Sequence, residues 1–185
     1  MTTLLARRFT VRDCYRMLEA DILTEDDRVE LIRGEIIPMS PISPCHTGRV
    51  KRLNRLFFTR LGDRVVVSVQ APIEVDDTSE PQPDLAVLTF HDDCYASRHP
   101  KPEDILLVVE VANTPGDYDR EIKMPLDAAA NMQEVWLLDV TSQCLEVFQI
   151  PTPDGYQSVQ QFYRGQQVSL LAFPEVVVSV DEVLG

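Results

Sequence analysis

The sequence predicts an α/β protein in which a central mixed sheet of about five strands is flanked by helices. Segments with a helical repeat of apolar residues alternate along the chain with short runs of strand-forming residues. The run 104–112 (DILLVVEVA) is apolar almost throughout, as expected of a central strand buried on both faces. With 185 residues, 44% of them hydrophobic and 25% charged, the chain is predicted to form a single domain over residues 1–185.

The first half of the chain is predicted to hold two helices, a hairpin and three further strands. Thr10 stands as the N-cap of the first helix, with Asp13 at its third position. The hairpin turns at Arg33 and Gly34, between two short apolar runs. In the second helix apolar residues recur at helical spacing and basic residues occupy the other faces. The expected elements are a helix over 10–20, strands over 29–32 and 35–39, a helix over 46–61, and strands over 64–70, 73–75 and 84–88.

The second half is predicted to continue the sheet beyond the central run. A helix should extend through 119–132, where Pro125 must either bend it or lie in its first turn. The C-terminal segment 173–185 suits either a strand or a short helix, and the sequence leaves this open. The remaining strands are expected at 135–140, 144–150 and 156–163.

The net charge of −13 argues against a general affinity for nucleic acid, because such a chain repels a polyanion on average. Basic residues nevertheless gather within the helix predicted at 46–61. They are Arg49, Lys51, Arg52, Arg55 and Arg60. A local patch can attract phosphate where the average charge repels it, so Arg49, Lys51, Arg52 and Arg55 are candidate nucleic-acid contacts. The alternative is a helix face that is simply solvated.

No apolar run reaches the roughly 18–20 residues that a membrane span needs. The N-terminal segment lacks the apolar stretch of a signal peptide, so the expected location is the cytoplasm and no membrane partner is expected. The cysteines at 14, 45, 94 and 144 show no spacing typical of a zinc site, and we expect reduced thiols.

Two carboxylates stand where burial would be costly. Glu110 is the single charge inside the central apolar run, and Asp84 follows Pro83 at the expected start of a strand. Each has an ordinary explanation: Glu110 could pair with a basic side chain at the strand end, and Asp84 could be a turn or cap residue. Together with Lys123, thirteen residues after Glu110, they form a pattern typical of phosphodiester hydrolysis. In that chemistry paired acids hold Mg²⁺ and a cation faces the phosphate.

Three segments resemble the successive motifs of the Uma-two-type restriction endonuclease family, a branch of the PD-(D/E)XK nuclease superfamily. They are VELIRGEIIPMSPISPCH, EPQPDLAVL and LLVVEVANTPGDYDREIKMPLDAAANMQEVWLLDV. The similarity spans roughly residues 10–150 and keeps the family's motif order. The resemblance implies a restriction-endonuclease-like fold and metal-dependent cleavage of nucleic acid, most naturally DNA, with Mg²⁺ or Mn²⁺ as cofactor. A homodimer is compatible with it.

The resemblance also implies roles for single residues. Asp84 matches the family's metal-binding aspartate, Glu110 the acid of its central strand, and Lys123 its lysine. In the plain superfamily pattern that lysine stands two residues after the acid, where this chain has Ala112. The family resembles branches in which the lysine has moved to the following helix. The backbone carbonyl of Val111 is expected to complete the metal shell with water molecules.

Two further matches and two departures concern neighbouring positions. Glu30 matches a hairpin glutamate that can support a metal, and His46 matches a frequent family histidine without an assigned role. Asp127 stands where the family usually has Tyr, and Asn131 where it usually has Gly. These departures bear on the packing of the helix, and an added acid near Lys123 could alter its pairing.

Lys123 could act as a general base only if its pKa fell by about three units from roughly 10.4, at a cost near 4 kcal/mol. Because two carboxylates and a phosphate disfavour that fall, we expect Lys123 to remain charged, stabilise the phosphate and position the attacking water. The competing hypothesis is a catalytically silent nucleic-acid-binding or scaffold protein that retains the nuclease fold.

Overall fold

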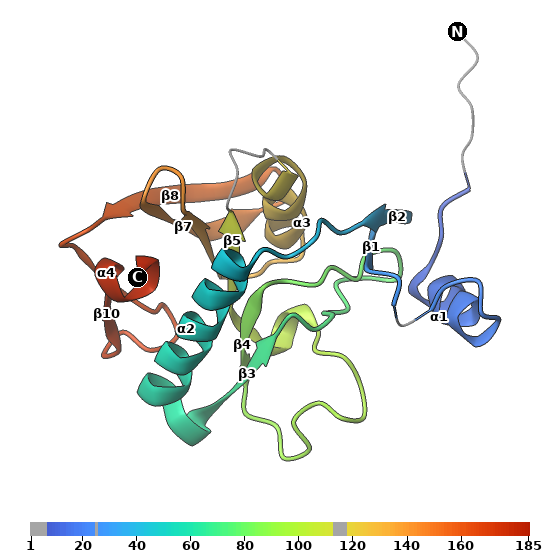
Figure 1. The fold of residues 1–185 in the computed structure, drawn as a ribbon, viewed down its shortest axis with the longest axis horizontal. Coiled ribbons are helices and arrows are strands. Elements are labelled where there is room, and N and C mark those ends of the chain that lie inside the picture. The colour runs from blue at the N-terminus through green and yellow to red at the C-terminus, as the bar shows by residue number, and fades with distance from the viewer. Residues whose placement is uncertain (1–6, 25, 113–117) are drawn as a thin grey trace, which may run out of the picture.

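A six-stranded mixed sheet forms the centre of the structure, a computed structural model that describes residues 7–24, 26–112 and 118–185 (Figure 1). The strand order is β3-β4-β5-β6-β7-β8. The β5–β6 pair is parallel, and the other pairs of this sheet are antiparallel. The strands are β3 (Val65–Val69), β4 (Leu85–Thr89), β5 (Ile105–Ala112), β6 (Glu134–Asp139), β7 (Cys144–Thr152) and β8 (Gly155–Tyr163). The predicted mixed α/β class is confirmed, with one strand more than expected.

Strand β5 lies inside the sheet and is buried on both faces, as its apolar sequence predicts. Because successive side chains point to opposite faces, Val109 and Val111 join one core cluster and Val108 and Ala112 join the other. Glu110 lies two residues from both Val108 and Ala112, so its side chain lies on the same face of the sheet as theirs. It therefore points to the face on which Met124 and Met132 pack, which is the side of Lys123.

Helix α2 (Pro44–Leu61) covers the first face of the sheet, beside the short helix α4 (Val180–Leu184) (Figure 1). It begins two residues earlier than predicted, because Pro44 suits the first helical turn and Ser43 caps the backbone N–H of His46. Its apolar stripe meets the sheet at Phe57, whose ring centroid lies 5.8 Å from that of Trp136.

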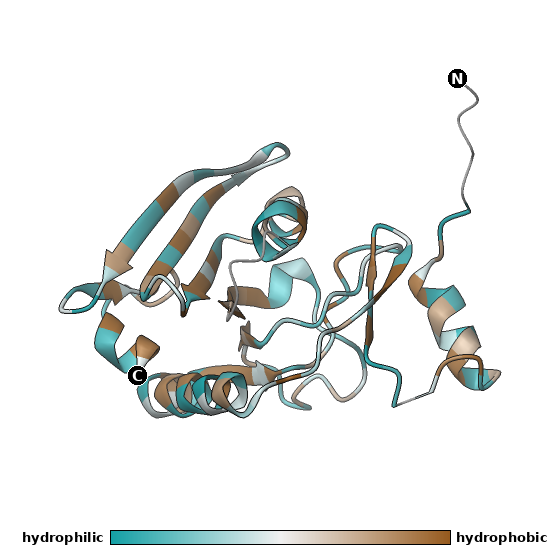
Figure 2. Ribbon diagram, turned by 45° about the horizontal axis from the view of Figure 1, so that its top comes forward, coloured by the Kyte–Doolittle hydropathy of each residue, from teal (hydrophilic) through white to brown (hydrophobic). Residues whose placement is uncertain are grey.

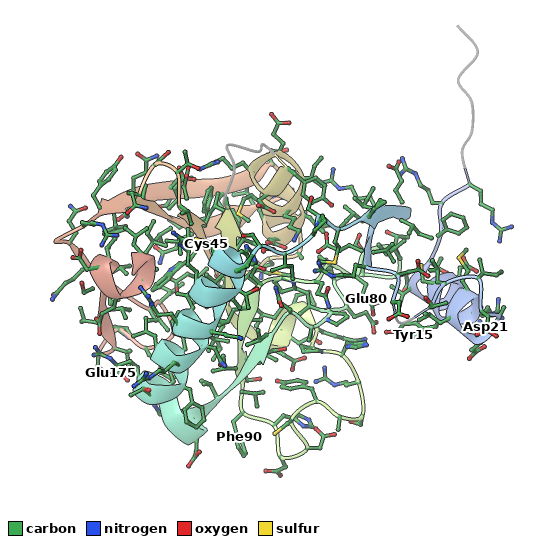
Figure 3. The ribbon with its side chains drawn as sticks, viewed as in Figure 1. Tyr15, Asp21, Cys45, Glu80, Phe90 and Glu175 are labelled. Carbon is green, nitrogen blue, oxygen red and sulfur yellow. The ribbon has the colours of Figure 1, made fainter. Side chains whose placement is uncertain are left out.

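Helix α1 (Val11–Glu19) and the hairpin of β1 (Val29–Ile32) and β2 (Glu35–Pro38) lie to one side of the central sheet (Figure 1). Both were predicted, as was the reciprocal cap between Thr10 and Asp13. No residue of α1 is buried. The helix is held by contacts such as that of the Tyr15 hydroxyl with the Glu80 carboxylate at 3.3 Å (Figure 3).

The predicted strand at 73–75 does not form. Its N–H groups bond to scattered carbonyls in a loop, for example Ile73 to Pro81 and Glu74 to Pro100. Prolines at 72, 81 and 83 in and around this segment lack the N–H groups that a strand ladder requires. Residues 71–75 therefore run as a loop beside the hairpin.

The helix predicted at 119–132 is divided into a π-helical turn, η3 (Asp119–Lys123), and helix α3 (Met124–Ala129). Pro125 lies in the first turn of α3, one of the two arrangements that its missing N–H allowed. A wider π turn accommodates the chain just before it. The turn carries Lys123 into the interior of the protein, where it is buried.

The C-terminal segment forms both of the elements that its sequence left open. Strand β10 (Val177–Ser179) pairs with β9 (Gln167–Ser169), and α4 follows directly. Strand β7 is buried over its first five residues, whereas β8, at the edge of the sheet, is largely exposed and mixes hydrophobic with hydrophilic residues (Figure 2). The remaining short elements are the 3-10 turns η1 (Gly62–Arg64) and η2 (Pro102–Asp104).

Within the three described ranges, no helix has the length and apolar character that crossing a membrane would require.

Candidate active site

Asp84 and Glu110 lie side by side at one end of two central strands. Asp84 directly precedes β4, Glu110 lies near the end of β5, and the antiparallel register pairs Leu85 with Val109. Each carboxylate accepts a hydrogen bond from a backbone N–H at or next to the other acid. The N–H of Asp84 donates to Glu110 Oε2 at 3.2 Å, and the N–H of Val111 donates to Asp84 Oδ2 at 2.9 Å. The register itself therefore holds the two carboxylates together.

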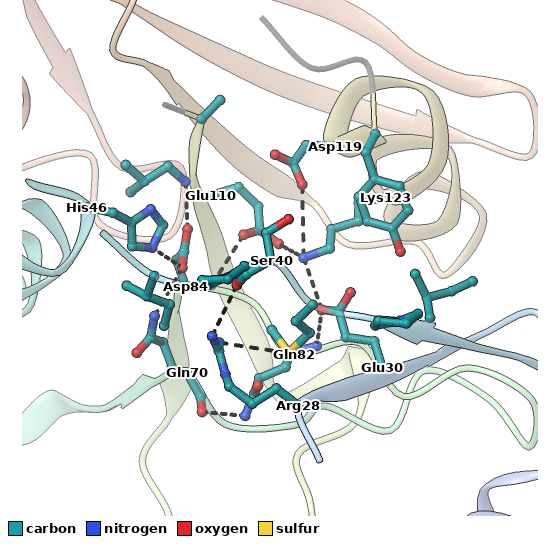
Figure 4. Close-up of a pocket in the computed structure, with 18 of the residues that line it drawn as sticks. Arg28, Glu30, Ser40, His46, Gln70, Gln82, Asp84, Glu110, Asp119 and Lys123 are labelled. Atoms are coloured by element: carbon teal, nitrogen blue, oxygen red, sulfur yellow. Dashed lines mark hydrogen bonds and ion pairs between the residues drawn. The ribbon is translucent and has the colours of Figure 1, made fainter. Parts of the chain in front are cut away.

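Lys123 reaches this pair from the π turn, as Figure 4 shows. Its Nζ lies 2.9 Å from Glu110 Oε1, 3.1 Å from Glu30 Oε1 and 4.0 Å from Asp119 Oδ1. The side chain of Glu30 is 3% exposed although its hairpin lies beside the sheet. Glu30, expected in a peripheral hairpin, thus shares Lys123 with Glu110.

Negative charge outweighs positive charge around this lysine. Burial raises the pKa of Glu110 well above its ordinary value, and the carboxylates of Asp84, Asp119 and Glu30 raise it further against the opposing effect of Lys123. Burial likewise raises the pKa of Asp119. Burial would lower the pKa of Lys123, but Glu110, Glu30 and Asp119 outweigh it and hold that pKa well above its ordinary range. Lys123 is therefore a charged ammonium at neutral pH.

His46, in the first turn of α2, contacts the other side of Asp84. Its Nε2 lies 2.7 Å from Asp84 Oδ1, and both side chains are mostly buried. The hydrogen bond to Asp84 raises the pKa of His46, and a bond to the backbone of Val111 acts in the same direction. The structure thus gives the histidine of unassigned role a direct contact with the predicted metal-binding aspartate.

Two glutamines that the sequence did not single out complete this network. Gln70 Nε2 donates to Asp84 Oδ1 at 3.4 Å, while Gln82 donates its N–H to Glu30 Oε1 at 2.8 Å and its Nε2 to the carbonyl of Gln70 at 2.6 Å. Gln82 lies two residues before Asp84, in the EPQP segment. The sequence alone could therefore have predicted that Gln82 lies near the site. The position of Gln70 follows only from the pairing of β3 with β4.

All of these side chains open into one cavity of about 690 Å³. It lies between the end of the central strands, the hairpin, the loop before α2 and the start of η3 (Figure 4). Arg28, at its lining, is exposed and donates to the carbonyl of Ser40 at 3.1 Å. In the described ranges Arg28 forms no ion pair.

The carboxylates fit a divalent metal ion by their chemistry. Carboxylate oxygens are the ligands that Mg²⁺ and Mn²⁺ prefer, and the excess of negative charge favours a bound cation. Among the described residues no group of three or more possible ligands is already arranged around one point. Protein donors hold the carboxylates instead: Lys123 at Glu110, and His46 at Asp84. Asp84 and Glu110, with the Val111 carbonyl and Glu30, would hold the ion.

The basic residues predicted to contact nucleic acid lie outside the cavity, on the solvent side of α2. Lys51 and Arg55 are exposed and one helical turn apart. Arg52 is exposed and lies against the backbone of Gly185. Arg49 is half-buried and donates to the carbonyl of Cys45 at 3.3 Å. Because His46 of the same helix lines the cavity, this basic face begins next to the site.

A solved structure shares this architecture and defines the class of fold. The chain is similar to "a putative nuclease belonging to DUF820" from Anabaena variabilis ATCC 29413, with a TM-score of 0.76 and 15% sequence identity. The alignment covers 95% of this chain and 97% of that one. A family model, Uma2, described as "Putative restriction endonuclease", matches residues 13–181. The chain therefore belongs to the Uma2 family. No curated protein matches its sequence.

Proposed function

We propose that this protein is a metal-dependent endonuclease that hydrolyses phosphodiester bonds, with DNA as its substrate. The observation that carries the proposal is the convergence of Asp84, Glu110 and Lys123 at the floor of one cavity. Membership of a family described as "Putative restriction endonuclease" supports the same chemistry.

In this proposal the two acids hold the metal and the neighbouring backbone fixes their positions. The N–H groups of Asp84 and Val111 orient the carboxylates of Glu110 and Asp84 before any ion binds. Mg²⁺ or Mn²⁺ would supply an acidified water molecule and stabilise charge on the phosphate. The burial of Glu110 excludes bulk water and strengthens these interactions.

Lys123 supplies a fixed positive charge rather than a base. Its pKa is held well above the ordinary range, so giving up its proton at neutral pH would be costly. A charged Nζ beside Glu110 stabilises negative charge that develops on a phosphate and orients the water that attacks it. Arg28 is the more accessible cation of the cavity, and its guanidinium suits a flanking phosphate.

Thermal unfolding with and without Mn²⁺ tests the metal site directly. An ion that binds only the folded protein adds about 2.7 kcal/mol at a free concentration of 100 times its Kd. We expect Mn²⁺ to raise the Tm of the wild type, the shift to disappear in Asp84→Asn, and the exposed-acid control Glu103→Gln to keep it. A wild type that gains nothing from Mn²⁺ would refute the metal site.

A further inference from the structure

The lining of the cavity consists of two chemically different parts. One part holds the carboxylates and Lys123. The other is apolar and comes from the end of β2, the loop that follows it and Tyr118. This apolar lip consists of Ile37, Pro38, Met39, Pro41, Ile42 and Tyr118. A sugar-phosphate backbone is charged and polar, so binding it alone would not bury this apolar surface.

The apolar lip is accessible from solvent. Ile42 is 36% exposed and Tyr118 is 38% exposed. Tyr118 presents an aromatic ring to the cavity, and aromatic rings of this kind stack on the faces of nucleic-acid bases. The faces of nucleic-acid bases are the apolar surface that such a lip would cover.

Arg28 connects the lip to the polar part of the site. Its Nη1 donates to the Ser40 carbonyl at 3.1 Å, and its Nη2 lies 4.0 Å from Met39 Sδ. The loop that carries the apolar side chains is thereby held next to a cation that suits phosphate. A nucleotide presents both features, an apolar base and a phosphate, to one binding site.

The acids lie deep in the cavity. The side chain of Glu110 is 5% exposed and that of Asp84 is 15% exposed. A cavity of about 690 Å³ is within the usual range for a pocket that encloses a small-molecule ligand. It suits a nucleotide that enters it, whereas the bases of a regular duplex are stacked inside the helix and cannot meet the lip.

We propose that the site takes an unpaired nucleotide, so that the substrate is single-stranded or locally unpaired DNA. The lip holds a base while the adjoining phosphodiester reaches Asp84 and Glu110. The inference rests on the proposed nuclease function, which it makes more specific by naming the substrate class.

Binding measurements test the role of the lip without relying on cleavage. Fluorescence anisotropy with Ca²⁺ present compares a short labelled single strand, the same strand in a duplex, and an abasic strand with the same phosphates. The oligonucleotides are checked to be intact after each measurement. Because stacking of a base on the lip strengthens binding, we expect the single strand to bind about tenfold more tightly than the other two.

Variants separate base contact from general affinity. We expect Ile42→Ser and Tyr118→Ser to lose about tenfold in single-strand binding, and Tyr118→Phe, which keeps the ring, to retain it. Phe90→Ser is the matched control, because Phe90 is 57% exposed outside the cavity (Figure 3). An abasic strand that binds as tightly as the normal one would overturn the proposal, as would an equal loss in Phe90→Ser.

Cleavage by the Mn²⁺-loaded protein distinguishes this inference from the proposed function. Faster cleavage of single-stranded or gapped DNA than of duplex supports both. Equal cleavage of duplex and single strand overturns the substrate class and leaves the nuclease standing. Base-dependent binding without cleavage of any DNA supports the nucleotide pocket and overturns the nuclease.

Discussion

Among the described residues that line the cavity, carboxylates outnumber cations, and this imbalance affects the protonation of several of them. Glu110 and Asp119 bind protons more tightly than usual, while Lys123 is held in its charged form. A purely structural ion pair would instead match one acid to one base. The surplus supports the proposed metal site, because a bound cation would offset it.

The surplus predicts an unusual response to neutralising an acid. In EDTA, Asp84→Asn and Glu110→Gln should leave the free energy of unfolding unchanged or higher, because each relieves repulsion between carboxylates. Lys123→Met should lose about 3–5 kcal/mol, the usual cost of breaking a buried pair. Urea unfolding measures all three. A loss of several kcal/mol in both acid variants would mean that the acids are structural.

Substituting Glu30 should affect the cleavage rate less than substituting Glu110, although both side chains contact Lys123. The backbone N–H of Asp84 donates to Glu110, whereas Glu30 accepts from the N–H of Gln82. We therefore expect Glu30→Gln to lower the single-turnover cleavage rate less than Glu110→Gln does. Equal losses in two folded variants would make Glu30 a primary metal ligand.

The sequence predicted most of the residues that the fold brings together. Asp84, Glu110, Lys123, Glu30 and His46 all line one cavity. Their catalytic and metal-binding roles stay predictions. The contributions of Arg28, Gln70 and Asp119 were not predicted. Their proximity depends on a loop contact, on a strand pairing and on a π turn, none of which leaves a pattern in the sequence.

At the scale of elements, helix α3 carries a buried acid that the catalytic proposal does not use. Asp127 is 3% exposed, and burial raises its pKa from 3.8 to about 7. Since the pKa is higher in the folded state, the folded protein binds the proton more tightly. The stability that this contributes is present below about pH 4 and is lost as the pH rises to about 7.

Asp127→Asn should therefore stabilise the protein at pH 8, by at most about 4 kcal/mol. At pH 4 the gain should disappear. The measurement is the difference in unfolding free energy between wild type and variant across this pH range, with the exposed Asp154→Asn as control. A difference that does not change with pH would show that Asp127 has an ordinary pKa in the folded protein.

The basic face of α2 makes a separate prediction. Reversing Lys51 and Arg55 to Glu should weaken DNA binding and reduce its dependence on salt, without changing metal affinity. The matched control is Arg12→Glu with Arg16→Glu, which has the same spacing on the exposed helix α1. If the control weakens binding equally, net charge rather than the α2 face governs affinity.

Elements with a clear period or cap were predicted well, and Pro125 lies in a first helical turn, one of the two predicted arrangements. The strand predicted at 73–75 was wrong, and the π turn was not predicted. The hairpin, α1, α2 and β5 follow from caps and apolar spacing. The loop at 73–75 and the π turn depend on the positions of prolines relative to hydrogen bonds made elsewhere in the fold. A local pattern does not contain that information.

For the whole molecule, the net charge of −13 gives little information about the site. The buried carboxylates sit within the cavity, while exposed basic residues line the neighbouring helix face. The mixed sheet and its flanking helices were predicted from the order of elements. The reach of Glu30 from the side hairpin to Lys123 required the three-dimensional packing.

The most direct test of the central claim is cleavage of DNA by the Mn²⁺-loaded protein, compared with Glu110→Gln shown by circular dichroism to be folded. Single-stranded, gapped and duplex substrates are assayed together. The account predicts metal-dependent cleavage by the wild type that falls by at least about a hundredfold in the variant. Absence of metal-dependent cleavage on every substrate, or equal cleavage by wild type and Glu110→Gln, would contradict it and favour a catalytically silent protein that retains the nuclease fold.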